Sequence, residues 1–292
     1  MITAVLLLSC MVVSAADKFT VYSVNYPLAY FAERIGGEHI KVVFPLPSDV
    51  DPAFWEPDAE DIAGFQQADL ILLNGAGYAR WVKRVSLPRR KLVNTSAVFG
   101  QEYISVAETV THQHGPGGEH SHAGTAFTTW LDFKQAIQQA RAIQLALEKH
   151  QPEYADTFRQ NFALLETDLE CLDTDLKLLT AVNPKMLFIA SHPVYQYFAR
   201  RYNIHLQSVM WEPDVMPKEQ QWNQLDRLLQ KYPANWMIWE GEPHKQTVTK
   251  LQKVGLGSLV FDPCANRPTQ GDFLSVMDEN IKQLKQAYLK NK

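Results

Sequence analysis

Four of the chain's nine histidines lie within eleven residues, and their spacing suits the binding of a metal ion. His112 and His114 form one His-x-His pair, His120 and His122 form another, and the sequence Gly-Pro-Gly-Gly separates the two pairs. Neutral imidazole is a common ligand for borderline metals, and histidine-rich tracts are typical of metal-binding segments. A surface tract without a defined site is the alternative. Two pairs around a glycine-rich turn favour metal binding.

Further metal-competent side chains follow the apolar runs of the second half that are typical of strands. Four such residues come within two positions of a strand end: His192, Glu212, Glu240 and Asp262. In open α/β sheets, ligands bind beyond the carboxyl ends of the strands, so these side chains are expected at one edge. Carboxylates are also common at helix N-termini. We predict that His192 is a ligand and that Glu240 or Asp262 completes the site, and we interpret Glu212 as a helix cap. In the first half, Glu56 is either a further ligand or a cap.

Strands and helices alternate in the first half, which predicts a parallel sheet covered by helices. The expected strands are residues 19–24, 40–44, 70–73 and 91–93. The expected helices are residues 27–35, 58–67 and 79–85. The histidine-rich segment, residues 111–124, closes this first lobe, which we assign to residues 17–131.

The second half begins with two amphipathic runs, residues 132–150 and 152–179, in which apolar residues recur every three or four positions. The second run would form a helix of about 40 Å at about 1.5 Å per residue, long enough to be a rigid link between two lobes. An α/β series follows, with strands at 186–190, 204–210, 236–239 and 258–261, and helices at 194–202, 218–231, 246–254 and 272–289. We therefore predict an α/β fold of two lobes, each a parallel sheet flanked by helices, joined by a long helix. The helical segment is assigned to residues 132–181 and the second lobe to residues 182–292.

Composition and the first residues limit the class of protein. A hydrophobic content of 46% and a charged content of 21% are ordinary for a globular protein, and a formal charge of −4 gives no reason to expect nucleic-acid binding. Residues 1–16 are apolar, end in two alanines and resemble a secretory signal peptide. They are fewer than the roughly 20 residues that a spanning helix needs. We expect an exported, periplasmic monomer. Pairing between Cys171 and Cys264 is left open.

Enzyme signatures are absent from the sequence. It contains no His-Glu-x-x-His string, no Gly-x-Ser-x-Gly elbow and no glycine-rich phosphate-binding loop. No Ser-His-Asp set stands out from the other serines, histidines and aspartates. We therefore do not predict an enzyme.

Several short strings occur together in an order that is specific as a set. They are Tyr26-Pro27, residues 51–57 (DPAFWEP), residues 69–75 (DLILLNG), a histidine-rich segment before Trp130-Leu131-Asp132, Ser191-His192, residues 197–202 (YFARRY), and Asp262 ahead of a helix bearing Asn280-Ile281. In this order the chain resembles the solute-binding proteins of zinc and manganese ABC importers. The resemblance covers essentially the whole chain after residue 16.

The resemblance implies that the two lobes hold a metal ion between them and pass it to a membrane permease. It also implies that His192 and Asp262 are ligands. The sequence departs from the family pattern at Ala53 and Thr128, where such proteins typically carry ligand histidines. Neither side chain replaces an imidazole, so the chain represents a divergent subgroup with two usual ligands missing.

We predict that His120 and His122 supply the missing first-lobe ligands and that His112 and His114 are outer residues that capture the ion. Three imidazoles and one carboxylate suit the tetrahedral preference of Zn²⁺, the expected cargo, and Mn²⁺ is less favoured. Two alternatives remain open. One is a periplasmic zinc metallochaperone or buffer without a transporter, and the other is a zinc-dependent hydrolase with Glu240 or Glu242 as general base.

Overall fold

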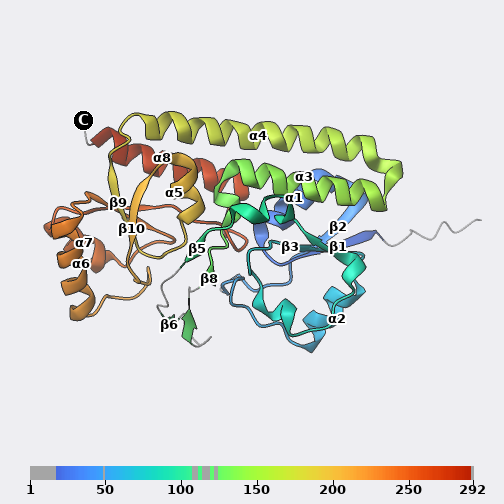
Figure 1. Ribbon diagram of the computed structural model, residues 1–292, viewed down its shortest axis with the longest axis horizontal. Helices are drawn as coiled ribbons and strands as arrows, with labels where there is room; N and C mark the ends of the chain where they lie inside the picture. Colours follow the sequence, from blue (N-terminus) through green and yellow to red (C-terminus); the bar gives the residue numbers. More distant parts are fainter. Residues whose placement is uncertain (1–17, 49, 107–110, 114–118, 122–123, 291–292) are drawn as a thin grey trace, which may run out of the picture.

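The computed structural model describes residues 18–290, apart from residues 49, 107–110, 114–118 and 122–123. It confirms the predicted fold class. Two four-stranded parallel sheets are each flanked by helices, and one long helix lies along both (Figure 1). In the part of the chain that the structure describes, no helix combines the length and apolar character that crossing a membrane requires.

The first sheet has the strand order β2-β1-β3-β4, and all its strands are parallel. Its elements are β1 (Phe19–Ser23), α1 (Tyr26–Gly36), β2 (Ile40–Val43), α2 (Ala59–Gln67), β3 (Leu70–Leu73) and β4 (Leu92–Asn94). α1 begins at Asn25, whose side chain accepts a hydrogen bond from the Leu28 N–H, and α2 begins at Asp58 in a capping box. The helix expected at 79–85 is only a 3₁₀ turn, Arg80–Lys83, because Ala79 adopts a left-handed conformation with φ of 51°.

The second sheet has the equivalent order β10-β9-β11-β12 and is also parallel throughout. Its elements are β9 (Leu187–Ala190), α5 (Gln196–Tyr202), β10 (His205–Ser208), α6 (Glu219–Lys231), β11 (Trp236–Trp239), α7 (Lys245–Lys253), β12 (Gly257–Val260) and α8 (Phe273–Lys290). In both sheets the strand order reverses between the first and third strands. Such a reversal is a topological switch point, where ligands bind in open α/β sheets.

The long helix α4 (Ala155–Ala181) follows α3 (Phe133–His150) and a 3₁₀ turn, Pro152–Tyr154. One face of α4 is buried through apolar residues three or four apart: Phe158, Phe162, Leu165, Leu169, Leu172 and Leu176. α4 contacts α1 and α3 on the first-lobe side and α5 and α8 on the second-lobe side (Figure 1). The helix therefore spans both lobes. Cys171 on α4 is exposed and Cys264 is buried, and both thiols are free.

Hydrogen bonds also join the two lobes directly, close to the carboxyl ends of the strands. Backbone and side-chain donors take part: Tyr26 N–H to Ala265 O at 2.9 Å, Trp130 Nε1 to Pro263 O at 2.7 Å, and Asn266 Nδ2 to Pro47 O and to Val50 O at 2.7 Å each. These bonds and α4 tie the lobes on two sides. We therefore expect little room for a wide hinge motion.

The histidine-rich segment carries short antiparallel pairings, although no strand was expected there. β5 (Ser105–Val106) pairs with β8 (Gly124–Thr125), and β6 (Thr111–Gln113) pairs with β7 (Glu119–Ser121). His112 and His120 are direct partners in the β6–β7 register. His114 and His122 lie outside the described residues.

Candidate metal centre

The strand order of the second sheet brings His192 and Glu240 to the same switch point. His192 follows β9 and Glu240 follows β11, and these two strands are neighbours. The segment that carries Glu212 is bonded to the same place, because the Trp211 N–H donates to the Ser191 carbonyl at 2.9 Å. Residues distant in the sequence thus meet beyond the carboxyl edge of one sheet.

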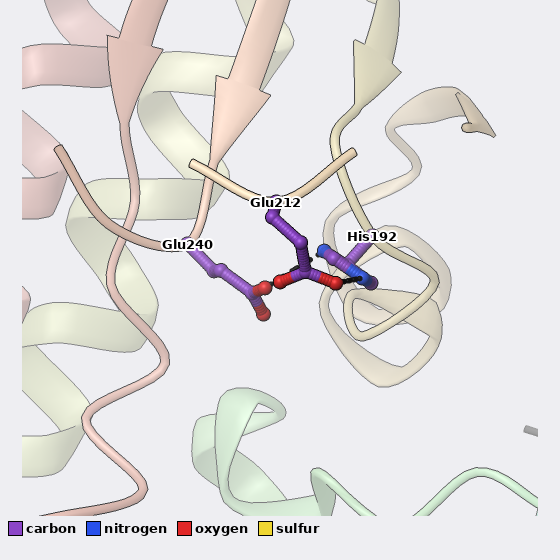
Figure 2. Close-up of side chains that lie close together, drawn as sticks. All are labelled: His192, Glu212 and Glu240. Atoms are coloured by element: carbon purple, nitrogen blue, oxygen red, sulfur yellow. Dashed lines mark ion pairs between the residues drawn. The ribbon is translucent and has the colours of Figure 1, made fainter. Parts of the chain in front are cut away.

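The imidazole of His192 contacts two carboxylates, one through each ring nitrogen (Figure 2). Its Nδ1 is 2.8 Å from Glu240 Oε1, and its Nε2 is 3.4 Å from Glu212 Oε1. The His192 side chain is only 1% exposed, whereas the two glutamates are about one-fifth exposed. One ligand atom from each of the three residues lies within 4.8 Å of the others. This group could therefore bind a metal ion.

The two carboxylates control the protonation of His192. Burial by itself lowers the pKa of the imidazole, but the negative charges of Glu240 and Glu212 and their hydrogen bonds outweigh burial and raise it to about 10. The metal-free site therefore holds an imidazolium at neutral pH. A divalent ion that binds there must displace a proton, and the same two carboxylates would then balance the charge of the metal.

Asp262 lines the same cavity, and hydrogen bonds hold both its side chain and its backbone in place. Its Oδ1 accepts the Cys264 N–H at 2.7 Å, and its backbone N–H and carbonyl are both bonded to the Asn280 amide, at 2.9 and 2.7 Å. Burial raises the pKa of Asp262, the Cys264 N–H lowers it, and the charge of Glu240 raises it. Asp262 is thus a second-lobe carboxylate that a bound cation would stabilise in its ionised form.

A cavity of about 300 Å³ separates these residues from the first lobe. Its second-lobe lining includes His192, Glu212, Glu240 and Asp262. Its first-lobe lining includes Ala53 and Thr128, the two positions at which the family resemblance expects histidines, together with Asp51 and several apolar and aromatic residues. The Thr128 hydroxyl donates to the Val194 carbonyl of the second lobe. At these two positions the first lobe offers no imidazole.

The structure brings together only part of the predicted ligand set. His192 and Glu240 are in contact, and Asp262 lines the same cavity. The backbone of His120 lies in β7, opposite His112 in β6, while His114 and His122 fall outside the described part of the chain. The assignment of His120 and His122 as ligands, with His112 and His114 as capturing residues, stays a prediction.

Two carboxylates differ from their sequence interpretation. Glu212 does not cap a helix, since α6 starts at Glu219 with Lys218 as its N-cap, and Glu212 instead contacts His192. Glu240 was selected from the sequence because it follows a strand, and Glu212 also follows one. Glu212 was nevertheless interpreted as a helix cap, because carboxylates are common at helix N-termini. Glu56 neither caps α2 nor lines the cavity among the described residues. It pairs with Arg84 on the surface, and Asp58 caps the helix.

Comparison with known proteins agrees with this architecture. The family model of the zinc-uptake complex component A, periplasmic, matches residues 21–287, and the chain belongs to this family of metal-importer solute-binding proteins. The zinc-binding lipoprotein AdcA of Streptococcus pneumoniae is 23% identical to this chain. The match covers 97% of this chain but only 59% of the length of AdcA. The manganese ABC transporter substrate-binding lipoprotein PsaA of Streptococcus pneumoniae is 26% identical, over 93% of the chain and 89% of the relative. The crystal structure of the Zn(II)-bound ZnuA-like domain of Streptococcus pneumoniae AdcA has the same fold. Superposition of the two structures gives a TM-score of 0.77 at 20% sequence identity, and the match covers 92% of this chain and 98% of the AdcA domain.

Proposed function

We propose that this protein captures Zn²⁺ in the cavity between its lobes and delivers it to the membrane permease of an ABC importer, acting outside the cytoplasm in the periplasm. One observation carries the proposal. A buried imidazole contacts two carboxylates at a topological switch point, on the wall of a cavity that both lobes line. Membership of the solute-binding family and the zinc-binding name of one relative support the same reading.

The second lobe supplies the fixed part of the proposed coordination. His192 gives one nitrogen, and the adjacent carboxylates are Glu240, Glu212 and Asp262. Zinc prefers four ligands in a tetrahedron, so one imidazole and one carboxylate leave two positions to fill. For an ion that arrives without other ligands, we propose that His120 and His122 fill them after first capture by His112 and His114.

Manganese is the second candidate cargo, because the second-lobe set has one imidazole and three carboxylates. Oxygen ligands suit Mn²⁺ better than they suit Zn²⁺. One relative is named as a manganese-binding protein. Competition between the two ions for the purified protein separates the candidates. Zinc is expected to displace manganese, and retention of manganese in equimolar zinc would reverse the assignment.

Two other functions can be separated from import by direct assays. A metallochaperone or buffer would bind zinc without stimulating uptake, so transport into vesicles that contain the cognate permease distinguishes it from an importer component. A hydrolase would need an open metal position and a free general base. Of the two glutamates that could serve as this base, Glu240 is ion-paired with His192, and Glu242 is not among the described residues that line the cavity. Members of the family are solute-binding proteins, and we expect no hydrolytic turnover by the zinc-loaded protein.

Calorimetric titration with zinc tests the site directly. The variant His192→Ala is expected to lose at least about a hundredfold in affinity, because it removes the only imidazole among the described lining residues. His205→Ala is a matched control, since His205 lies exposed in β10 of the same sheet. Unchanged affinity in His192→Ala would refute the cavity as the metal site. Unchanged affinity in both His120→Ala and His122→Ala would refute only the proposed first-lobe ligands.

A further inference from the structure

The cavity between the lobes is larger than a metal ion needs. Its volume of about 300 Å³ compares with the roughly 10–15 Å³ that one ordered water occupies by the same kind of measure. Pockets for small organic molecules begin at about 300 Å³ and combine apolar walls with a few well-placed polar groups. The size therefore fits a small organic ligand together with an ion.

The two walls of the cavity differ in chemistry. The second-lobe wall carries His192 and the carboxylates described above, which can reach a metal. The first-lobe wall carries four aromatic side chains, which we call the aromatic wall: Phe54, Tyr78, Phe127 and Trp130. Tyr78 is central to it, with ring centroids 5.3 Å from Phe127 and 5.8 Å from Trp130, both edge to face. These rings supply no zinc ligand. Phe54 and Phe127 are partly exposed and can pack against organic groups, whereas Tyr78 is 8% exposed and Trp130 is fully buried.

The Tyr78 hydroxyl is a polar group that the protein leaves unsatisfied. Tyr78 is 8% exposed, and its buried oxygen has no hydrogen-bond partner among the described residues. A buried donor without a partner costs about 1–3 kcal/mol, and such groups in native structures are uncommon. This oxygen has almost no accessible surface in the metal-free protein, so an acceptor on a bound ligand would remove that cost only once the Tyr78 side chain turns its hydroxyl toward the cavity. A bare metal ion has no acceptor to offer.

Ala53 and Thr128, the two positions at which the chain departs from the family resemblance, line the cavity with small side chains. Ala53 is small, and Thr128 directs its hydroxyl to the Val194 carbonyl. Both residues line the cavity where the resemblance implies imidazoles. Small side chains at these positions leave more room in the cavity than two imidazoles would leave.

We propose that the cavity also accepts a metal ion already bound to a small organic chelator. The chelator's nitrogen and oxygen donors then occupy the coordination positions that His120 and His122 fill around a bare ion. The inference rests on the proposed function, because His192 and its neighbouring carboxylates hold the metal in both cases. The chelator lies against the aromatic wall, and the Tyr78 hydroxyl donates to one of its acceptors. The acidic second-lobe wall selects complexes of positive or zero net charge, such as zinc with one amino-acid chelator.

Zinc alone and zinc premixed with L-histidine are suitable probes, because histidine supplies chelating nitrogens and a carboxylate acceptor. The proteins are the wild type, Tyr78→Phe, and a variant in which all four histidines of the 111–124 segment are replaced by alanine. The four-histidine variant is expected to lose at least about tenfold in affinity for zinc alone and to regain it with L-histidine. Native mass spectrometry should then show one protein, one zinc and one histidine.

Tyr78→Phe keeps the ring and removes only the hydroxyl, so it tests the role of that group. It is expected to weaken binding of zinc–histidine by about 5–10-fold, the equivalent of one hydrogen bond, and to leave the affinity for zinc alone unchanged. Zinc premixed with 2,2′-bipyridine is the matched control, since that chelator is flat and has no spare acceptor. Its binding should not change in Tyr78→Phe. Ala53→Leu, which narrows the cavity, should weaken binding of both chelates more than it weakens binding of zinc alone.

The outcomes separate this inference from the proposed function. If zinc binds alone and depends on His192, yet neither chelator enters a ternary complex, the inference is overturned and the proposed function stands. If zinc binds neither alone nor with a chelator, both are overturned. If L-histidine binds equally well without zinc, the cavity takes an organic amine and the chelate proposal is wrong.

Discussion

Zinc binding at neutral pH should release a proton from His192, and the amount can be worked out from the structure. The imidazole contacts Glu240 and Glu212, which raise its pKa to about 10 despite burial. At pH 7 a group of that pKa is about 99.9% protonated, so binding to its nitrogen releases about one proton. An imidazole with the ordinary pKa of about 6.5 would release only about 0.2.

The same difference sets how affinity depends on pH. Competition with a proton of pKa about 10 lowers the apparent affinity at pH 7 by about a thousandfold, or about 4 kcal/mol. Apparent affinity should therefore rise about tenfold per pH unit from pH 7 to pH 9. A site built from histidines of ordinary pKa would already be close to its maximal affinity at pH 7.5.

Calorimetry in several buffers of different ionisation enthalpy measures the protons released. The variant without the four histidines of the 111–124 segment is the best protein for this measurement, because His192 is then the only imidazole expected at the metal. Glu240→Gln is the matched control. It removes the carboxylate closest to Nδ1, so the His192 pKa and the proton release should both fall. The reasoning would be refuted if zinc binding to the four-histidine variant released about 0.2 proton or less. Zinc affinity that stays constant between pH 7 and 9 would refute it as well.

Three further predictions concern the first-lobe wall, the support of Asp262 and the metal-free protein. Ala53→His places an imidazole in the cavity lining and should raise zinc affinity at least about tenfold in a competition assay; no gain would argue against capture between the lobes. Asn280→Leu removes two hydrogen bonds to the Asp262 backbone and should lower the free energy of unfolding by about 1–3 kcal/mol. Urea denaturation measures this change, and an unchanged free energy of unfolding would show that Asp262 needs no such support. In the metal-free protein the folded-state pKa of His192, about 10, lies above its unfolded value of about 6.5. Its contribution to stability is therefore complete below about pH 6.5 and is lost as pH rises through about 10, which His192→Gln should abolish in urea titrations across that range.

The fold was predictable because local patterns follow the period of each element. Apolar residues three or four apart place α4 within a few residues of its observed bounds, and short apolar runs locate the strands of both sheets. The 3₁₀ turn at Arg80–Lys83 was not predictable, because the left-handed backbone at Ala79 depends on its surroundings and leaves no mark in hydrophobic spacing.

The candidate site was only half predictable. His192, Glu240 and Asp262 follow strands, and the rule that ligands gather beyond strand ends selects them without knowledge of pairing. Glu212 follows the same rule. A carboxylate near a proline is equally typical of a helix cap, so sequence alone could not choose between the two roles. The observed start of α6 at Glu219 removes the cap interpretation.

By itself, the sequence determined the kinds of chemistry available: a histidine-rich tract, a second half with polar residues at its strand ends, and two positions that lack the expected imidazoles. Tertiary structure alone decided which of these groups meet. The order of elements along the chain leaves the order of strands in the sheet open. In the folded protein β9 and β11 are neighbours, and this places Glu240 against His192. Tertiary structure also decided that the cavity wall opposite them is aromatic. Packing within the first lobe joins Tyr78 and Phe127, residues about fifty positions apart, and no local pattern records a contact of that range.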